Sequence, residues 1–247
     1  MSNEQSSLFN EMEKLKKRFD EKSKEDTPKE DNSLSEQAVF QLMTKAAIPE
    51  RFKKATFDSF EDRTEKLKNL KKAMLNYSRK LATEKEFNAN CLMLGSVGSG
   101  KTHLAISALK NFISFNKTGY FITLNSLLMS YKNFGVSSVN NVNIDYALNA
   151  DLLVIDEVNT FLSEMSDFDK NNLFTIFNHR YNKVKPTIII SNLNPKQIEQ
   201  ALGVQVLSRL FEDTKNQLIF NEEDYRGISK WEYPNRVKKV LKILKKN

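Results

Sequence analysis

The stretch Gly95-Ser96-Val97-Gly98-Ser99-Gly100-Lys101-Thr102 follows the pattern G-x-x-x-x-G-K-[ST] of a phosphate-binding loop, or P-loop. Its glycines let backbone N–H groups point inward at a phosphate, in a space too tight for Cβ atoms. Lys101 is expected to reach the β- and γ-phosphates of ATP, and the Thr102 hydroxyl to ligate Mg²⁺. The expected nucleotide-binding residues are those of the loop and the residue after it: Gly95, Ser96, Val97, Gly98, Ser99, Gly100, Lys101, Thr102 and His103.

The segments around the loop alternate between strand and helix patterns. Expected strands cover residues 90–94, 120–124, 152–155, 187–191 and 216–220, and expected helices cover 62–83, the end of the loop to about 116, 126–134, 144–149, 167–182 and 195–211. Residues 135–143, GVSSVNNVN, are expected to form a polar loop. Such alternation predicts an α/β fold with a parallel five-stranded sheet and helices on both faces.

Residues 1–47 are predicted to be an N-terminal helical arm with a linker, ahead of a main domain at 48–226. Leu8, Met12, Leu15 and Phe19 lie at helical spacing, while residues 20–33 contain no large apolar side chain. A second short helix is expected over Ser35–Lys45. Two such helices are too small for a core of their own, so they dock either on the main domain or on another protein, and we favour the partner.

Composition and charge exclude several classes of protein. There is one cysteine, Cys91, in an expected strand, which argues against a disulfide framework or a Cys-rich zinc module. The chain has no membrane-length apolar run, and its start lacks the features of a secretory signal, so we expect a cytoplasmic protein without a membrane partner. The net charge of +7 is typical of proteins that bind polyanions, most often nucleic acid, although a lysine-rich surface also serves solubility.

Much of this charge lies in a basic C-terminal tail at 227–247. Residues 226–247 hold eight Lys or Arg and one Glu, a net of +7. Residues 235–247 place apolar side chains on one helical face and lysines on the rest. This pattern is compatible with binding to DNA, to an acidic protein or to an anionic membrane, and equally with packing on the domain.

Two further strand ends carry polar residues that suit a phosphate site. Asp156 and Glu157 follow the apolar run at 152–155, and Asn192 follows the run at 187–191. Asp156 is expected to hold Mg²⁺ together with Thr102, the Walker B role, and Glu157 to deprotonate the attacking water. Asn192 is expected to contact that water or the γ-phosphate, with Asn194 as a second candidate. The alternative for the acids is a solvated pair at a strand end.

Arg209 lies among apolar residues in V-L-S-R-L-F at 206–211. It is a candidate arginine finger, a residue that stabilises the charge on ATP bound to a neighbouring subunit. A buried stem with a local salt bridge is the alternative.

Together these segments resemble the AAA+ ATPases, and within them the bacterial helicase-loader family typified by DnaC. The resemblance covers about residues 46–226. It depends on I-P-x-R-F…T-F-x-x-F at 48–60, G-x-x-G-S-G-K-T-H-L-A at 95–105, L-L-V-I-D-E at 152–157, R-Y…P-T-I-I-I-S-N at 180–192, L-G-x-x-V-x-S-R-L at 202–210 and F-x-x-x-D-Y-R at 220–226.

The resemblance implies a protein that binds the hexameric replicative helicase through its N-terminal region and binds ATP and single-stranded DNA through its AAA+ domain. It implies self-association into a spiral with shared active sites, and a position near the adenine for residues 48–60. The arm does not visibly match a loader N-terminus. Only 27 residues follow residue 220, too few for a full C-terminal lid domain, so a second sensor arginine is in doubt and Arg226 is the position to examine.

Single-stranded DNA binding requires cations and aromatic side chains. Lys117, Tyr131, Lys132 and Phe134 are the candidates, and the alternative is that Tyr131 and Phe134 cover the core.

We therefore expect an ATPase, slow and regulated by DNA or a partner, that loads the replicative helicase onto single-stranded DNA. The alternative is an IstB-like ATPase partner of a transposase that acts on duplex DNA. A third interpretation, a nucleotide-dependent adaptor without hydrolysis, is disfavoured by Glu157.

Overall fold

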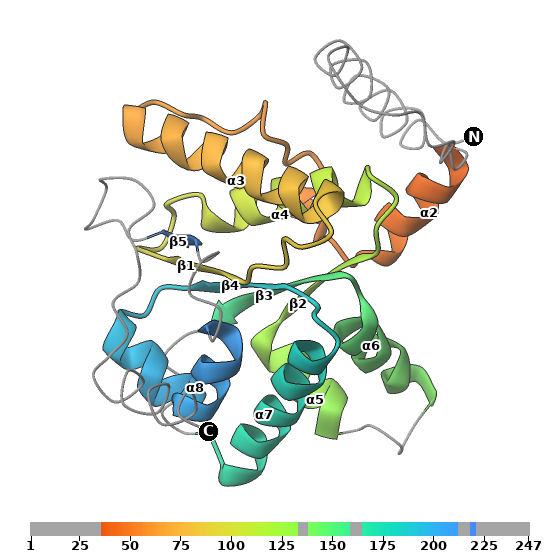
Figure 1. Cartoon of the computed structure of the whole chain (residues 1–247), viewed down its shortest axis with the longest axis vertical. Helices are drawn as coiled ribbons and strands as arrows, with labels where there is room; N and C mark the ends of the chain where they lie inside the picture. The colour runs from red at the N-terminus through yellow and green to blue at the C-terminus, as the bar shows by residue number, and fades with distance from the viewer. Residues whose placement is uncertain (1–35, 133–137, 159–164, 212–217, 221–247) are drawn as a thin grey trace.

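A parallel sheet forms the centre of the computed structural model, which describes residues 36–132, 138–158, 165–211 and 218–220 (Figure 1). The strands are β1 (Cys91–Leu94), β2 (Gly119–Thr123), β3 (Leu152–Val158), β4 (Thr187–Ser191) and β5 (Leu218–Phe220), in the order β2-β3-β4-β1-β5. All neighbouring pairs are parallel. The strands are unequal: β2, β3, β4 and β1 form the body of the sheet, and only three residues of β5 pair with β1 at its edge.

Helices cover both faces of this sheet, as expected (Figure 1). On one face lie α2 (Glu36–Lys45), α3 (Glu65–Thr83) and α4 (Lys101–Ile113), with a short 3-10 helix at Glu50–Phe52 before α3. On the other lie α5 (Leu124–Lys132), α6 (Ser138–Asn149), α7 (Asp167–Asn182) and α8 (Pro195–Phe211). The predicted α/β P-loop fold with a parallel sheet is confirmed.

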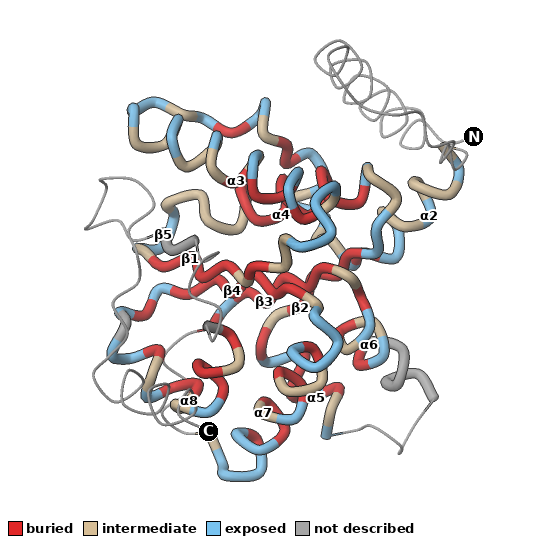
Figure 2. The backbone as a smooth tube through the Cα atoms, in the orientation of Figure 1, coloured by how far each residue is buried: buried red, intermediate tan, exposed pale blue. Residues whose placement is uncertain are grey.

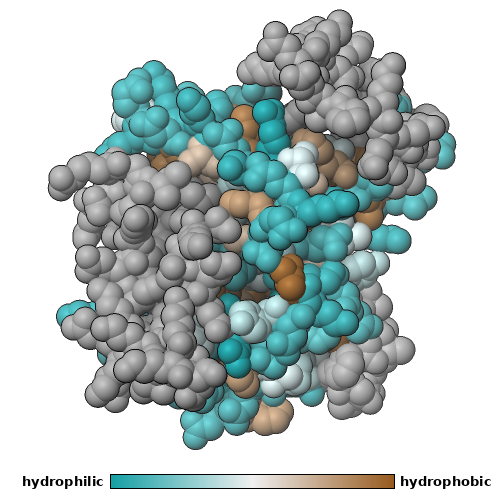
Figure 3. Space-filling model, viewed as in Figure 1, coloured by the Kyte–Doolittle hydropathy of each residue, from teal (hydrophilic) through white to brown (hydrophobic). Residues whose placement is uncertain are grey.

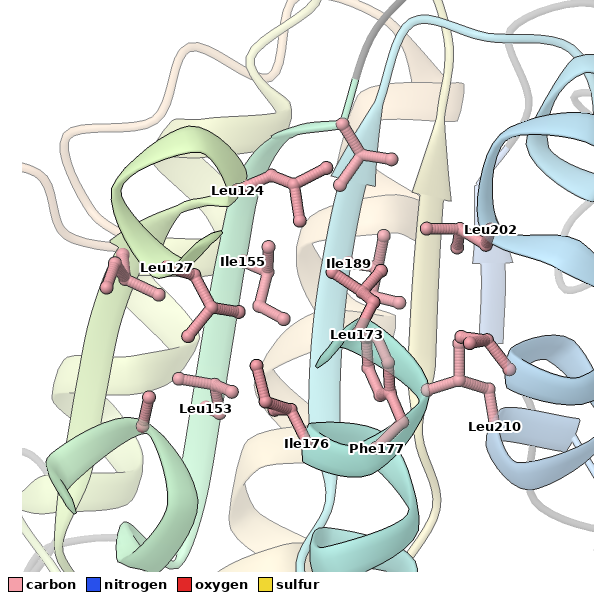
Figure 4. Close-up of a cluster of buried hydrophobic side chains, with 14 of the residues drawn as sticks. Leu124, Leu127, Leu153, Ile155, Leu173, Ile176, Phe177, Ile189, Leu202 and Leu210 are labelled. Carbon is pink, nitrogen blue, oxygen red and sulfur yellow. The ribbon is translucent and has the colours of Figure 1, made fainter. Parts of the chain in front are cut away.

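Successive side chains along each strand point to opposite faces of the sheet, and they contribute to two hydrophobic cores, one on each face (Figure 2). Leu153, Ile155 and Ile189 face α5–α8, where Figure 4 shows them among Leu173 and Ile176. The residues between them on the strands, such as Val154, pack against α3 and α4. Burial on both faces explains the continuous apolar runs in the sequence. Each such side chain stabilises the fold by about 1.5–3 kcal/mol.

One predicted loop is wrong in part. Residues 135–143 were expected to be a polar loop before a helix at 144–149, but α6 already begins at Ser138. Ile144 and Ala147 are completely buried and fix the helix on the domain. Tertiary packing therefore extends the helix over an Asn-rich segment of low helix propensity.

The second helix of the predicted arm lies against the main domain. Its side chains Val39, Leu42 and Met43 pack on the core beside α4, and the following Ala46 is fully buried. The Ala46 carbonyl accepts a hydrogen bond from the Phe121 amide of β2, at 2.8 Å. Residues 36–47 are thus part of the domain, the alternative that the sequence left open but did not favour, and the predicted boundary at 47/48 falls within a packed segment.

Several predicted features lie outside the described residues. They are the first arm helix and linker within residues 1–35, Phe134, Arg226 and the tail at 227–247. Within the described ranges, no helix combines the length and the apolar character needed to cross a membrane.

Candidate nucleotide-binding site

The P-loop connects β1 to α4 at the carboxyl edge of the sheet. Gly98 and Gly100 have positive φ angles of 83° and 88°, which L side chains rarely adopt. A Cβ on Gly100 would also lie 2.6 Å from Cε2 of Phe60. Gly100 forms the N-cap of α4 without a side-chain cap, so the backbone at this helix end suits an anion.

Lys101 folds back over the loop. Its Nζ donates to the carbonyl oxygens of Gly95, at 2.8 Å, and Ser96, and to Ser99 Oγ at 3.0 Å. The ammonium group is therefore held within the loop. Val97, at the tip, is 84% exposed.

Thr102 and Asp156, 54 positions apart, meet beside the loop. Thr102 Oγ1 donates to Asp156 Oδ2 at 2.8 Å, and Asp156 is buried at the end of β3. A hydroxyl and a carboxylate oxygen side by side are the hard oxygen ligands that Mg²⁺ takes in combination with substrate phosphates. The residues present thus fit the predicted metal site.

Glu157 adopts an unusual backbone conformation. It has φ +60°, is exposed, and lies in an irregular step of the β3–β4 register between Ile155 and Val158. Its amide donates to Asp156 Oδ1 at 2.7 Å. Left-handed backbone at a non-glycine residue costs about 1–2 kcal/mol, and such strain is concentrated at functional sites. The local structure turns Glu157 away from the packed strand, whereas Asp156 stays buried.

Asn192 follows β4 between the two strands that carry the loop and the acids. Ser191, the residue before it, pairs with Leu94 of β1 and with Val158 of β3. The Ser191 hydroxyl donates to the Val158 carbonyl and accepts from the Leu193 amide at 3.0 Å, so the backbone on both sides of the exposed Asn192 is fixed.

The second sensor candidate, Asn194, has a structural contact. Its Oδ1 accepts from the Gln197 amide at 3.0 Å, and its own amide donates to Gln197 Oε1 at 2.9 Å. This reciprocal pair caps the first turn of α8. Asn192 is therefore the better placed of the two.

Arg209 lies in the last turn of α8 and contacts α7. Its Nε donates to Asn178 Oδ1 at 3.1 Å, and its guanidinium carbon lies 5.0 Å from the centre of the Tyr181 ring. These two contacts join the arginine to an amide and to an aromatic ring.

The structure shows contacts between His103 and residues 56–60 that the sequence did not specify, although the resemblance implied a position near the adenine for residues 48–60. His103 Nε2 lies 2.9 Å from the Thr56 carbonyl oxygen and 3.2 Å from Ser59 Oγ, and the Phe60 ring meets the imidazole edge-on at 5.4 Å. Residues 56–60 therefore lie directly beside the first turn of α4. The I-P-x-R-F…T-F-x-x-F pattern at 48–60 did not by itself indicate which residues these side chains contact.

Of the four candidate DNA contacts, Phe134 lies outside the described residues, and the other three have different surroundings. Lys132 Nζ forms an ion pair with Asp169 Oδ1 at 2.9 Å, joining α5 to α7. Burial opposes ionisation of Asp169, but Lys132 and Ser166 more than offset it and lower the pKa of this carboxyl. Tyr131 packs against the core, which was the alternative for it, and Lys117 lies exposed in the α4–β2 connection.

The face of the molecule in Figure 3 is mostly hydrophilic where it is described, and apolar side chains on it are scattered. That part of the surface offers no broad apolar docking patch.

Comparison with known families identifies this arrangement. The model of the family described as IstB-like ATP binding protein matches residues 25–225. The chain belongs to this family. Membership agrees with the P-loop and the Thr102–Asp156 contact. The matched residues include α2 and all five strands of the sheet.

Curated relatives include replicative helicase loaders. The chain is 27% identical over 211 residues to the replicative helicase loader DnaC of Buchnera aphidicola subsp. Acyrthosiphon pisum, a match that covers 83% of this chain and 81% of the relative. It is 28% identical over 158 residues to DnaC of Escherichia coli K12, covering 62% of this chain and 63% of the relative.

Solved structures share the fold. A crystal structure of the DnaC helicase loader aligns with a TM-score of 0.61 at 22% identity, covering 70% of this chain and 99% of that chain. A crystal structure of DnaI aligns with a TM-score of 0.54 at 17% identity, covering 77% and 94%.

Proposed function

We propose that this protein is an ATP-dependent loader that delivers the replicative DNA helicase onto single-stranded DNA during replication initiation. The observation that carries the ATP-dependent part is the Thr102–Asp156 hydrogen bond, which joins the P-loop to the end of β3. The loader part is supported by similarity to DnaC over most of the chain. A loader of this kind would act in the cytoplasm.

ATP would be held with its phosphates against the P-loop and Lys101. Thr102 and Asp156 would hold Mg²⁺, which neutralises charge on the β- and γ-phosphates. Glu157 would take a proton from the attacking water, because its carboxylate lies on exposed backbone next to Asp156. Asn192 would donate to the γ-phosphate or orient the water. Turnover is expected to be slow and regulated by DNA or the helicase.

Arg209 would act on ATP bound to a neighbouring subunit. Support comes from its position in the last turn of α8, where Asn178 and Tyr181 of α7 contact its guanidinium. An active site completed in this way makes hydrolysis depend on assembly, and a spiral or ring of subunits would supply it.

Residues 1–35 are proposed as the helicase-binding segment, because 36–47 are occupied by packing on the domain. DNA is proposed to bind at the helical insertion α5–α6 between β2 and β3. Of the residues expected there, Lys132 is paired with Asp169, and Tyr131 packs against the core.

Size-exclusion chromatography with light scattering tests the loader function. The protein is mixed with its host's replicative helicase, with and without ATP, next to Lys101→Ala and a chain lacking residues 1–35. The full chain is expected to co-elute with the helicase. ATP should change this co-elution only when Lys101 is present, and the chain lacking residues 1–35 should not co-elute. Failure of the full chain to co-elute under both conditions would refute the loader function.

The second candidate is an ATPase partner of a transposase, favoured by the family description IstB-like ATP binding protein. DNA preference separates the two. A loader should bind single strands more tightly than duplex, with an affinity that falls as salt rises. Preference for duplex DNA, together with no helicase complex, would favour the transposition function.

A further inference from the structure

Contacts of the neighbouring Leu210 fix the backbone next to Arg209, and contacts of Arg209 itself hold its guanidinium. Asn90 Nδ2 donates to the Leu210 carbonyl at 2.8 Å, and Asn90 Oδ1 accepts from the Thr187 amide at 2.8 Å, which fixes the end of α8 to the start of β4. Leu210 itself is buried. The backbone beside Arg209 is therefore tied to the sheet.

The side chain is held separately, by α7. Asn178 Oδ1 accepts the Nε–H of Arg209 at 3.1 Å, and the guanidinium carbon lies over the Tyr181 ring, 5.0 Å from its centre. A guanidinium binds a phosphate best through two parallel N–H donors. Because Asn178 takes the Nε–H, a phosphate contact through Nη1 and Nη2 would use a different edge of the group.

We infer that Asn178 and Tyr181 are positioning residues for Arg209, which orient its guanidinium toward ATP on a neighbouring subunit. The inference rests on the proposed role of Arg209 and names the residues that make the role efficient. An arginine that is already oriented loses less rotamer freedom when it meets the phosphate, and misplacement of a catalytic group by about 1 Å costs up to about 100-fold. Neither residue lies in the P-loop or at the ends of β3 and β4, so the ATP site of their own subunit should be unaffected.

Mixed assemblies test this directly. Glu157→Gln subunits are expected to bind ATP without hydrolysing it and to keep Arg209, whereas Arg209→Ala subunits keep a complete ATP site but lack the arginine. A mixture of the two, with an oligo(dT) strand present, should recover ATP turnover that neither shows alone. The donor subunit contributes only its arginine, so further changes in the donor report on that arginine.

Asn178→Ala or Tyr181→Ala in the Glu157→Gln donor should lower the recovered kcat about tenfold and leave KM for ATP unchanged. Asn178→Asp keeps an acceptor for Nε–H, and Tyr181→Phe keeps the ring, so both should restore turnover. Asn171→Ala, an exposed asparagine on the same helix, is the matched control and should have no effect. Thermal melting of each donor shows that it is folded.

The outcomes distinguish the positioning role of Asn178 and Tyr181 from the action of Arg209 across subunits. Full recovery with the Asn178→Ala and Tyr181→Ala donors would overturn the positioning role and leave the trans role of Arg209 intact. No recovery with the Glu157→Gln donor itself would overturn both, because Arg209 would then not act across subunits. Equal loss with Asn178→Ala and Asn178→Asp would also count against positioning, since the acceptor would not be what matters.

Discussion

Replacing Arg180 with alanine should destabilise the protein by about 4 kcal/mol. Arg180 is 1% exposed, and it joins three segments at the amino ends of β3 and β4. Its Nε donates to Thr187 Oγ1 at 3.0 Å, Nη1 to the carbonyl oxygens of Ala147 and Ala150 at 2.9 Å each, and Nη2 to that of Pro186 at 2.7 Å. Burial lowers the pKa of Arg180 to about 9, which leaves it charged at neutral pH.

The magnitude follows from those four acceptors. Alanine would remove a donor from each of them in a buried site. The Pro186 carbonyl keeps the Leu153 amide as a donor, at 3.3 Å, whereas an acceptor left unsatisfied costs about 1–3 kcal/mol. Water entering the vacated space offsets part of this loss. The sum is therefore expected near the 3–5 kcal/mol typical when one partner of a buried charged network is removed.

Urea unfolding followed by circular dichroism measures the effect. With a slope of about 3 kcal/mol per molar urea, the midpoint should fall by about 1 M or more. Arg63→Ala is the matched control, because Arg63 pairs with Glu61 on the surface and its loss should change little. A midpoint for Arg180→Ala within the error of wild type would refute the reasoning. So would wild-type stability of Arg180→Lys, since lysine lacks the planar fork that reaches both residues 147–150 and residues 186–187.

Three other substitutions follow from local geometry. Gly100→Ala should weaken ATP binding at least tenfold in nucleotide titrations, because its Cβ would meet Phe60 at 2.6 Å and φ is +88°. Glu157→Gly should abolish hydrolysis yet raise stability by about 1 kcal/mol in thermal melts, because glycine accepts φ +60° without strain. Lys132→Ala should destabilise the protein most at neutral pH. Because the pKa of Asp169 is lowered in the folded protein, its ionised carboxylate stabilises the fold at pH values above the ordinary carboxyl pKa. This stabilisation is lost as the pH falls through the lowered pKa, so the stability difference between Lys132→Ala and wild type should shrink in acid.

The first two substitutions have a matched control variant, and the third is checked by its pH dependence. Gly98→Ala shares the positive φ but leaves its Cβ in open space, so it should weaken ATP binding less than Gly100→Ala. Glu157→Ala should show no gain in melting temperature, because alanine keeps the strain; equal gains would contradict the backbone argument. A pH-independent effect of Lys132→Ala would mean that the ion pair contributes no stability.

The nucleotide site could be predicted from the sequence because its parts are local. G-x-x-x-x-G-K-[ST] specifies the loop through glycines that must take positive φ, and apolar runs that end in Asp156 or Asn192 specify strands whose carboxyl ends meet at one edge of a parallel sheet. The Thr102–Asp156 contact follows from that topology. These features depend on backbone rules and on the period of apolar residues, which are written within a few neighbouring positions.

Only the tertiary structure decided the features that depend on distant partners. The helix expected over Ser35–Lys45 packs on the domain as α2 instead of remaining a partner-binding arm, and packing extends α6 over an expected polar loop. Lys132, expected to contact DNA, forms an ion pair with Asp169. Sequence patterns show which side chains are apolar or charged, but the choice among possible partners is made by the free energy of contacts between segments far apart in the chain, and this appears only once the chain has folded.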